Sequence, residues 1–108
     1  MLIVPLYPRR ILDMADLIAE AERNAALAEM PWDYDEERKS IFRSFGFRDF
    51  SEAFAFMTRV ALLAEKAGHH PDWSNSYNVV AISLSTHDAG GVTRNDIELA
   101  RRIDALIE

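Results

Sequence analysis

The sequence contains no cysteine. It can therefore form no disulfide, supply no thiol nucleophile and hold no zinc ion or iron–sulfur cluster through thiolates. Glycine and proline are scarce, with four of each among 108 residues, and they do not gather into a linker-like stretch. These shortages exclude disulfide-stapled and low-complexity chains and predict a folded protein.

Positive charge is also in short supply. Twelve Lys and Arg residues face eighteen Asp and Glu residues, and the resulting net charge of −6 repels phosphate backbones. We therefore expect no direct binding to nucleic acid. No apolar run approaches the ~20 residues that span a bilayer, so we also expect no membrane segment. Residues 1–6 are too short for a signal-peptide core, which favours a cytoplasmic location.

The residues that are present fit one globular domain over residues 1–108. Its shares of 49% hydrophobic and 28% charged residues are ordinary for such a domain. A chain of this length buries roughly two thirds of the surface that its unfolded form exposes. The core is therefore modest, and self-association would stabilise it.

Three segments show the three- and four-residue spacing of apolar side chains that is typical of amphipathic helices. The first covers residues 12–29 and is expected to end before Pro31. The second follows Asp49, runs to residue 67 and ends at Gly68, which suits a left-handed helix cap. The third follows Thr93 and Asp96 and carries apolar residues to position 107. The predicted apolar stripe of the second helix consists of Phe50, Ala53, Phe54, Met57, Val60, Ala61 and Ala64.

Four strands are expected between these helices. Residues 32–34 and 38–47 are aromatic-rich and predict a hairpin, in which Phe42 breaks the alternation and indicates a bulge or burial on both faces. Residues 73–86 predict two more strands around a turn at Tyr77-Asn78. The order αββαββα predicts an α+β fold in which a four-stranded antiparallel sheet has three helices packed on one face.

All three histidines lie between positions 69 and 87. His69 and His70 occupy a helix-to-strand junction, and His87 follows the last strand. An unperturbed imidazole titrates at about pH 6.5, so such residues can serve as acid and base. Two other interpretations stay open from spacing alone: a solvated loop pair with a strand-end histidine, or a zinc site.

Several nearby residues also have both a functional and a structural interpretation. Glu65 and Asp96 are candidates to orient an imidazole, or are a solvated carboxylate and a first-turn helix residue. Trp73 and Tyr77 are candidates to stack on a planar ligand, although aromatic residues in strands more often pack in a core.

The region around the histidines resembles the pterin-4a-carbinolamine dehydratase family. The resemblance extends over about residues 32–107. Before Trp32 only the helical character matches, and Pro31 stands where glycine is expected. The residues that carry the resemblance most specifically are Glu65-Lys66-Ala67-Gly68-His69-His70-Pro71-Asp72-Trp73, Asn75, Tyr77-Asn78 and Ser83-Leu84-Ser85-Thr86-His87-Asp88.

The resemblance implies a lyase that dehydrates 4a-hydroxytetrahydropterin, such as 4a-hydroxytetrahydrobiopterin, to quinonoid dihydropterin and water. This reaction recycles the pterin cofactor of aromatic amino acid hydroxylases and needs no metal or organic cofactor. By the same resemblance, the site comprises catalytic His69, His70 and His87, supporting Glu65 and Asp96, and pterin-lining Pro71 and Trp73. Which imidazole is the acid and which the base stays open.

The resemblance also implies partners. Members of the family form homodimers through sheet edges and homotetramers through helices, and some act as dimerisation cofactors for a transcription factor. A protein-binding role would need an exposed apolar helix face, for which Phe56 and Leu63, at or beyond the flank of the core stripe of the second helix, are the candidates. A further alternative is a dehydratase that acts on another hydroxylated pterin.

Overall fold

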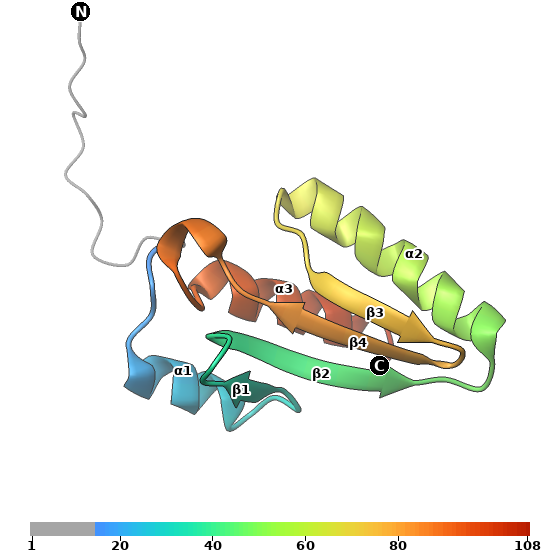
Figure 1. Cartoon of the computed structure of the whole chain (residues 1–108), viewed down its shortest axis with the longest axis horizontal. Helices are drawn as coiled ribbons and strands as arrows, with labels where there is room; N and C mark the ends of the chain where they lie inside the picture. Colours follow the sequence, from blue (N-terminus) through green and yellow to red (C-terminus); the bar gives the residue numbers. More distant parts are fainter. Residues whose placement is uncertain (1–14) are drawn as a thin grey trace, which may run out of the picture.

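The computed structural model describes residues 15–108, which form three α-helices, four strands and one short 3-10 helix (Figure 1). The predicted α+β order is confirmed. None of the helices in this part of the chain combines the length and the apolar character needed to cross a membrane. The elements are α1 (Glu20–Leu27), β1 (Asp33–Asp35), β2 (Ser40–Gly46), α2 (Phe50–Ala67), β3 (Asp72–Ser76), β4 (Val79–Leu84), the 3-10 helix η1 (His87–Ala89) and α3 (Arg94–Ala105).

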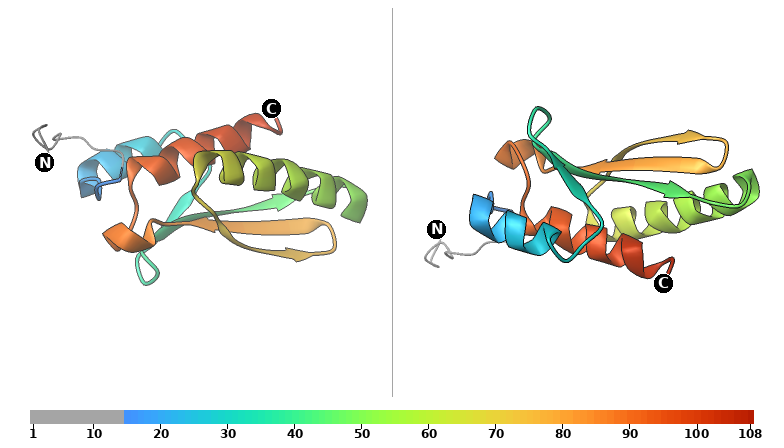
Figure 2. Two further views of the ribbon diagram at one scale, coloured as in Figure 1. Left: turned by 90° about the horizontal axis from the view of Figure 1, so that it is seen from above. Right: turned by 90° about the horizontal axis from the view of Figure 1, so that it is seen from below.

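The four strands form one antiparallel sheet in the order β1-β2-β4-β3. The helices lie on one face of this sheet and leave the other uncovered (Figure 2). The register of β2 with β4 runs without interruption from the pair Ile41–Leu84 to the pair Gly46–Val79. Neither predicted alternative at Phe42 is found: the continuous register leaves no bulge, and Phe42 lies on the uncovered face and is 41% exposed, so the sheet is not buried on both sides there.

The hydrophobic core lies between the covered face of the sheet and the helices. In β4, Val80, Ile82 and Leu84 are buried, as their alternation predicts. The intervening Ala81 and Ser83 have small side chains and belong to the uncovered face. One strand thus supplies both the core and a shallow outer surface.

The predicted apolar stripe of α2 is wrong in its centre. Phe56 is only 4% exposed and packs in the core, and Leu63 packs against it. Phe56 lies three residues after Ala53 and four before Val60, both fully buried, so it belongs to the middle of their stripe. Phe50 and Phe54 are instead exposed, by 48% and 57%. The exposed face that we assigned to Phe56 and Leu63 therefore lies elsewhere on α2.

Helix α1 is shorter than the predicted span of residues 12–29. Residues 12–14, like residues 1–6, lie outside the described part of the chain. Residues 15–19 are not helical, because Leu17 forms a β-bridge with Thr93 and the Ile18 N–H donates to the Val92 carbonyl at 3.2 Å. Helix α3 also ends before its predicted limit, and Ile107 is 42% exposed. Pairing with distant backbone thus decided where α1 begins.

Candidate active site

The β3–β4 hairpin brings the three histidines to one end of the sheet. Asp72, the first residue of β3, pairs with Ser83 near the end of β4. His69 and His70 precede β3, and His87 follows β4. Antiparallel pairing therefore places residues separated in sequence at the same end of the hairpin.

The end of α2 directs His69 and His70 toward this hairpin. Gly68 adopts the predicted left-handed conformation, with φ of 65°, and closes the helix. The His69 N–H then donates to the carbonyl of Ala64 at 3.1 Å. This cap turns the chain out of α2 immediately before the two imidazoles.

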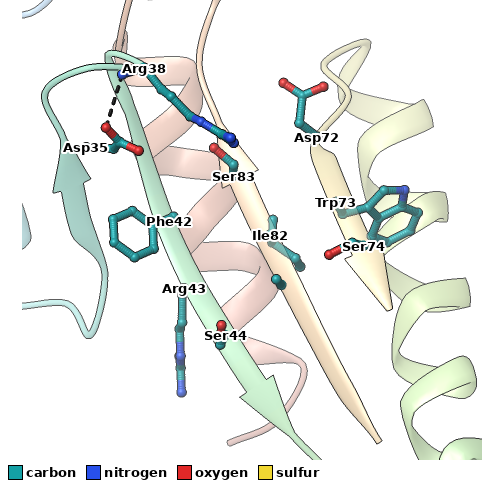
Figure 3. A pocket seen from close by; sticks show the side chains of 11 residues that line it. Asp35, Arg38, Phe42, Arg43, Ser44, Asp72, Trp73, Ser74, Ile82 and Ser83 are labelled. Atoms are coloured by element: carbon teal, nitrogen blue, oxygen red, sulfur yellow. Dashed lines mark hydrogen bonds between the residues drawn. The ribbon is translucent and has the colours of Figure 1, made fainter. Parts of the chain in front are cut away.

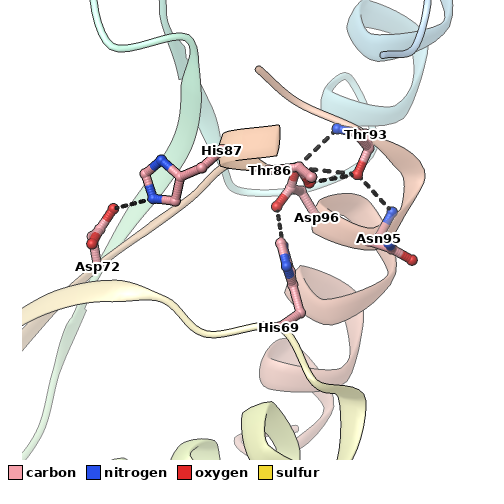
Figure 4. A network of polar contacts seen from close by, with 7 residues as sticks. All are labelled: His69, Asp72, Thr86, His87, Thr93, Asn95 and Asp96. Atoms are coloured by element: carbon pink, nitrogen blue, oxygen red, sulfur yellow. Dashed lines mark hydrogen bonds and ion pairs between the residues drawn. The ribbon is translucent and has the colours of Figure 1, made fainter. Parts of the chain in front are cut away.

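His69 is fixed by a buried carboxylate. Its Nε2 makes a short hydrogen bond with Asp96 Oδ1, and Asp96 is fully buried (Figure 4). The other oxygen of Asp96 accepts from the Thr93 N–H at 2.8 Å and from the Thr86 hydroxyl at 3.0 Å. Asp96 thus completes the predicted cap of α3 and also holds an imidazole. The His69 side chain is only 15% exposed as a result.

Thr86 links this network to the segment that carries His87. Its hydroxyl is 2.7 Å from the Thr93 hydroxyl. Its carbonyl accepts from the N–H groups of Ala89 and Gly90 at 3.1 and 3.0 Å, and its own N–H donates to Gly91 at 2.8 Å. These bonds close the turn in which His87 begins η1.

His70 and His87 lie at the surface, each beside a carboxylate. His70 Nε2 is 3.0 Å from Glu65 Oε1, a hydrogen-bond distance. His87 Nε2 is 3.8 Å from Asp72 Oδ2, which is ion-pair contact rather than a hydrogen bond. The two imidazole side chains are 63% and 82% exposed. They are available to a ligand, whereas His69 is mostly covered.

The three imidazoles thus have separate partners. Within residues 15–108, no hydrogen bond or ion pair joins one histidine to another, and no group of three or more His, Asp or Glu side chains is arranged to hold a metal ion. The zinc interpretation gains no support from this arrangement. Paired imidazoles and carboxylates are suited to moving protons.

A depression of about 430 Å³ adjoins the site on the uncovered face of the sheet. His87 and Asp72 line it together with Ser83 and Arg38. A second depression, of about 350 Å³, is bordered by Trp73, whose ring also packs against the core. Pro71 is partly buried between His70 and β3. The predicted role of Pro71 and Trp73 in lining a pterin pocket stays a prediction.

Sequence reasoning assigned no role to two residues of this site. Asp72 contacts His87, and Thr86 connects Asp96 to the turn of His87. Asp72 stands in the segment that carries the family resemblance, and hairpin register would have placed it near the end of β4. Thr86 stands in another segment that carries this resemblance, but its contact with Asp96 could not be predicted, because its hydroxyl meets Asp96 only after α3 packs beside the hairpin.

Fold and site together define a small α+β protein with histidine–carboxylate pairs at one end of an antiparallel hairpin. Residues 16–106 match the profile of the family described as pterin 4 alpha carbinolamine dehydratase. The chain therefore belongs to the pterin-4-alpha-carbinolamine dehydratase family.

Individual relatives agree with this assignment. A protein of Rhizorhabdus wittichii, described as a candidate pterin-4-alpha-carbinolamine dehydratase, is 58% identical over 92 residues, which cover 84% of this chain and 95% of that protein. A protein of Rhodopseudomonas palustris with the same description is 53% identical over 94 residues, covering 86% and 93%.

Two solved structures share the fold. A transcriptional coactivator/pterin dehydratase from Brucella melitensis is 48% identical, with a TM-score of 0.80 over 84% of this chain and 98% of that chain. A pterin dehydratase-like protein identified as a RuBisCO assembly factor in the alpha-carboxysome is 26% identical, with a TM-score of 0.62 over 72% of this chain and 90% of that chain. Proteins of this fold thus include one described as both a transcriptional coactivator and a pterin dehydratase, and another described as an assembly factor.

Proposed function

We propose that this protein dehydrates a 4a-hydroxytetrahydropterin to the quinonoid dihydropterin and water, by acid–base catalysis with histidine. The observation that supports this most is the pair of exposed imidazoles, His70 and His87, each beside a carboxylate at one end of the hairpin. In a cell with an aromatic amino acid hydroxylase, the reaction would recycle the pterin cofactor in the cytoplasm.

The elimination needs two proton transfers. One group removes a proton from a ring nitrogen, the C4a–O bond breaks, and a second group protonates the departing hydroxyl so that it leaves as water. Each transfer by a positioned side chain contributes about 10²- to 10⁴-fold in rate. His70 and His87 are the exposed imidazoles that can exchange protons with a substrate. Glu65 and Asp72 stabilise whichever imidazole carries the positive charge.

His69 has a different proposed role. Its contact with Asp96 leaves Nε2 occupied and the ring 15% exposed. We assign it to substrate contact and to holding the site together, and Asp96 to fixing its orientation. Pro71 and Trp73 would border the bound ring.

Stopped-flow absorbance tests the activity directly. Chemically generated 4a-hydroxytetrahydropterin loses water spontaneously, and the protein at micromolar concentration should accelerate this step. An unchanged rate would remove the proposed activity.

Metal removal should leave this activity unchanged. The proposed mechanism uses imidazoles as proton carriers, and the described residues offer no metal-binding cluster. Turnover should therefore be the same before and after prolonged dialysis against a chelator. Activity that is lost on chelation and restored by zinc would contradict the mechanism.

We also propose that the chain forms a homodimer or homotetramer. Phe50, Phe54 and Leu62 are exposed on α2 by 48%, 57% and 68%, and the rings of Phe50 and Phe54 lie 5.8 Å apart. Exposed apolar side chains that gather on one helix are typical of a contact surface. Light scattering should give a mass above that of one chain, and Phe54→Asp should lower it.

The matched control is Ala55→Asp, which adds the same charge to the next residue of α2, also exposed. It should leave the assembly intact. A monomeric wild-type mass at high concentration would contradict self-association, and equal effects of both variants would contradict this location.

The alternative function is binding to another protein. The exposed apolar side chains of α2 favour it, as do the roles of the Brucella coactivator/pterin dehydratase and of the carboxysome assembly factor. The two functions differ in one measurement, because a protein that acts only by binding would not accelerate pterin dehydration.

A further inference from the structure

The two depressions on the uncovered face of the sheet are parts of one groove. Arg38, Asp72 and Ser83 line both of them. His87 lies at one end, and Phe42 and Ser44 line the other. The groove therefore extends from an imidazole of the candidate active site across β4 and β2.

Small side chains make up part of the floor of this groove, beside the Phe42 ring. The Ser83 hydroxyl of β4 donates to the Ser40 hydroxyl of β2 at 3.0 Å. Ala81 and Ser44 continue the floor between the same strands. Because no helix covers this face, the small side chains leave space for part of a ligand (Figure 2).

Arg38 is directed over the groove by the β1–β2 turn. The Asp35 carboxylate accepts from the backbone N–H groups of Glu37 and Arg38, both at 3.0 Å, and so holds the turn. Lys39 completes it with φ of 53°, in the left-handed region. Figure 3 shows the Arg38 side chain reaching from this turn across β2 toward Ser83.

The Arg38 guanidinium has no partner within residues 15–108. Only its backbone N–H takes part in a hydrogen bond. Asp72, the carboxylate with which it shares the groove, contacts His87 instead. The planar, permanently charged donor group of Arg38 is thus free to bind oxygen atoms of a ligand.

We infer that Arg38 is a specificity-determining residue, whose guanidinium binds oxygen atoms on the side chain of the substrate's pterin ring. The inference rests on the proposed function, since it assumes that the ring reacts beside His87. With the reacting carbon near that imidazole, the rest of the substrate extends along the groove to Arg38. The site then favours pterins whose ring substituent carries hydroxyl or carboxylate groups over those with an alkyl substituent.

Calorimetric binding of three stable pterins tests this selectivity. The probes are 6-methylpterin, biopterin with its two side-chain hydroxyls, and pterin-6-carboxylate. Arg38→Ala should weaken binding of biopterin and the carboxylate by about 10-fold, because charge-assisted hydrogen bonds are lost, and the carboxylate should lose most. Binding of 6-methylpterin should change by less than about twofold, since its substituent makes no such bond.

Arg101→Ala is the matched control. It removes the same charge from an exposed residue of α3, in the helical layer away from the groove. It should leave the affinities for all three probes unchanged. A loss with Arg38→Ala that is equal for all three, or no loss at all, would overturn the inference, as would failure of the wild-type protein to bind any of them.

Calorimetry and the stopped-flow assay together separate this inference from the proposed function. Accelerated dehydration in stopped flow without side-chain selectivity would remove the role of Arg38 alone. Selective binding without accelerated dehydration would remove the proposed activity and leave Arg38 as a residue that selects among bound pterins.

Discussion

The single variants His70→Ala and His87→Ala should each turn over 4a-hydroxytetrahydropterin about 10²-fold more slowly or worse, because each imidazole would carry a proton in the elimination. Both side chains are largely exposed, at 63% and 82%, so their removal leaves no cavity. The fall should therefore appear in kcat while the fold stays intact. Stopped-flow turnover and circular dichroism measure the two effects.

The double variant His70→Ala/His87→Ala makes this prediction sharper. The effects of residues that act as one catalytic unit are strongly non-additive. The fold-reduction in turnover of the double variant should therefore be much smaller than the product of the two single reductions. Near-normal rates in the folded single variants would refute the acid–base assignment, even if pterin still bound.

His69→Ala should behave differently. Its loss leaves the buried Asp96 without its imidazole partner, so substrate binding and thermal stability should both fall. A large fall in kcat at unchanged KM and unchanged stability would instead make His69 a direct proton carrier.

Asp104→Ala should destabilise the protein by about 2–4 kcal/mol, the range for removing one partner of a largely buried polar network. Asp104 of α3 accepts hydrogen bonds from Trp32 and from Arg43 of β2. Both of its carboxylate oxygens accept from the Trp32 indole, at 2.9 and 3.0 Å, and Arg43 Nη1 lies 2.6 Å from one of them. Trp32 is 3% exposed, so its N–H would lose its acceptor inside the core.

Thermal and urea unfolding measure this loss, which should lower the melting temperature by at least about 10 °C in a domain of this size. The control is Glu98→Ala on the same helix, which breaks an exposed ion pair with Arg102 and should cost less than about 0.5 kcal/mol. Asp104→Asn keeps one acceptor and should fall between the two. Equal stability of Asp104→Ala and Glu98→Ala would show that the network contributes nothing measurable.

Local patterns predicted much of the fold. The alternation of β4 and the caps at Gly68 and Thr93 depend on neighbouring residues, and each is found as expected. The predictions for the centre of the apolar stripe of α2 and for the first residue of α1 were wrong. Both depend on contacts with other elements, since Phe56 packs against the rings of Phe45 and Phe47, and Leu17 pairs with the backbone at Thr93.

For the candidate site too, the sequence indicated the residues but not all of their contacts. Its imidazoles and two of their carboxylates, Glu65 and Asp96, stood out in the sequence, because few residue types exchange protons near neutral pH. The sequence did not show which carboxylate contacts His69 or His87. The partner of His69 lies 27 residues away on α3, and that of His87 lies at the start of β3.

By itself, the sequence determined the order of the elements, the family to which the chain is similar and the three histidines on which the proposed chemistry depends. The tertiary structure alone decided that His69 is covered while His70 and His87 are exposed, and that Arg38 reaches over a groove ending at His87. The reason is physical: periodicity and capping act within a few residues, whereas exposure and contact depend on how distant segments pack against one another.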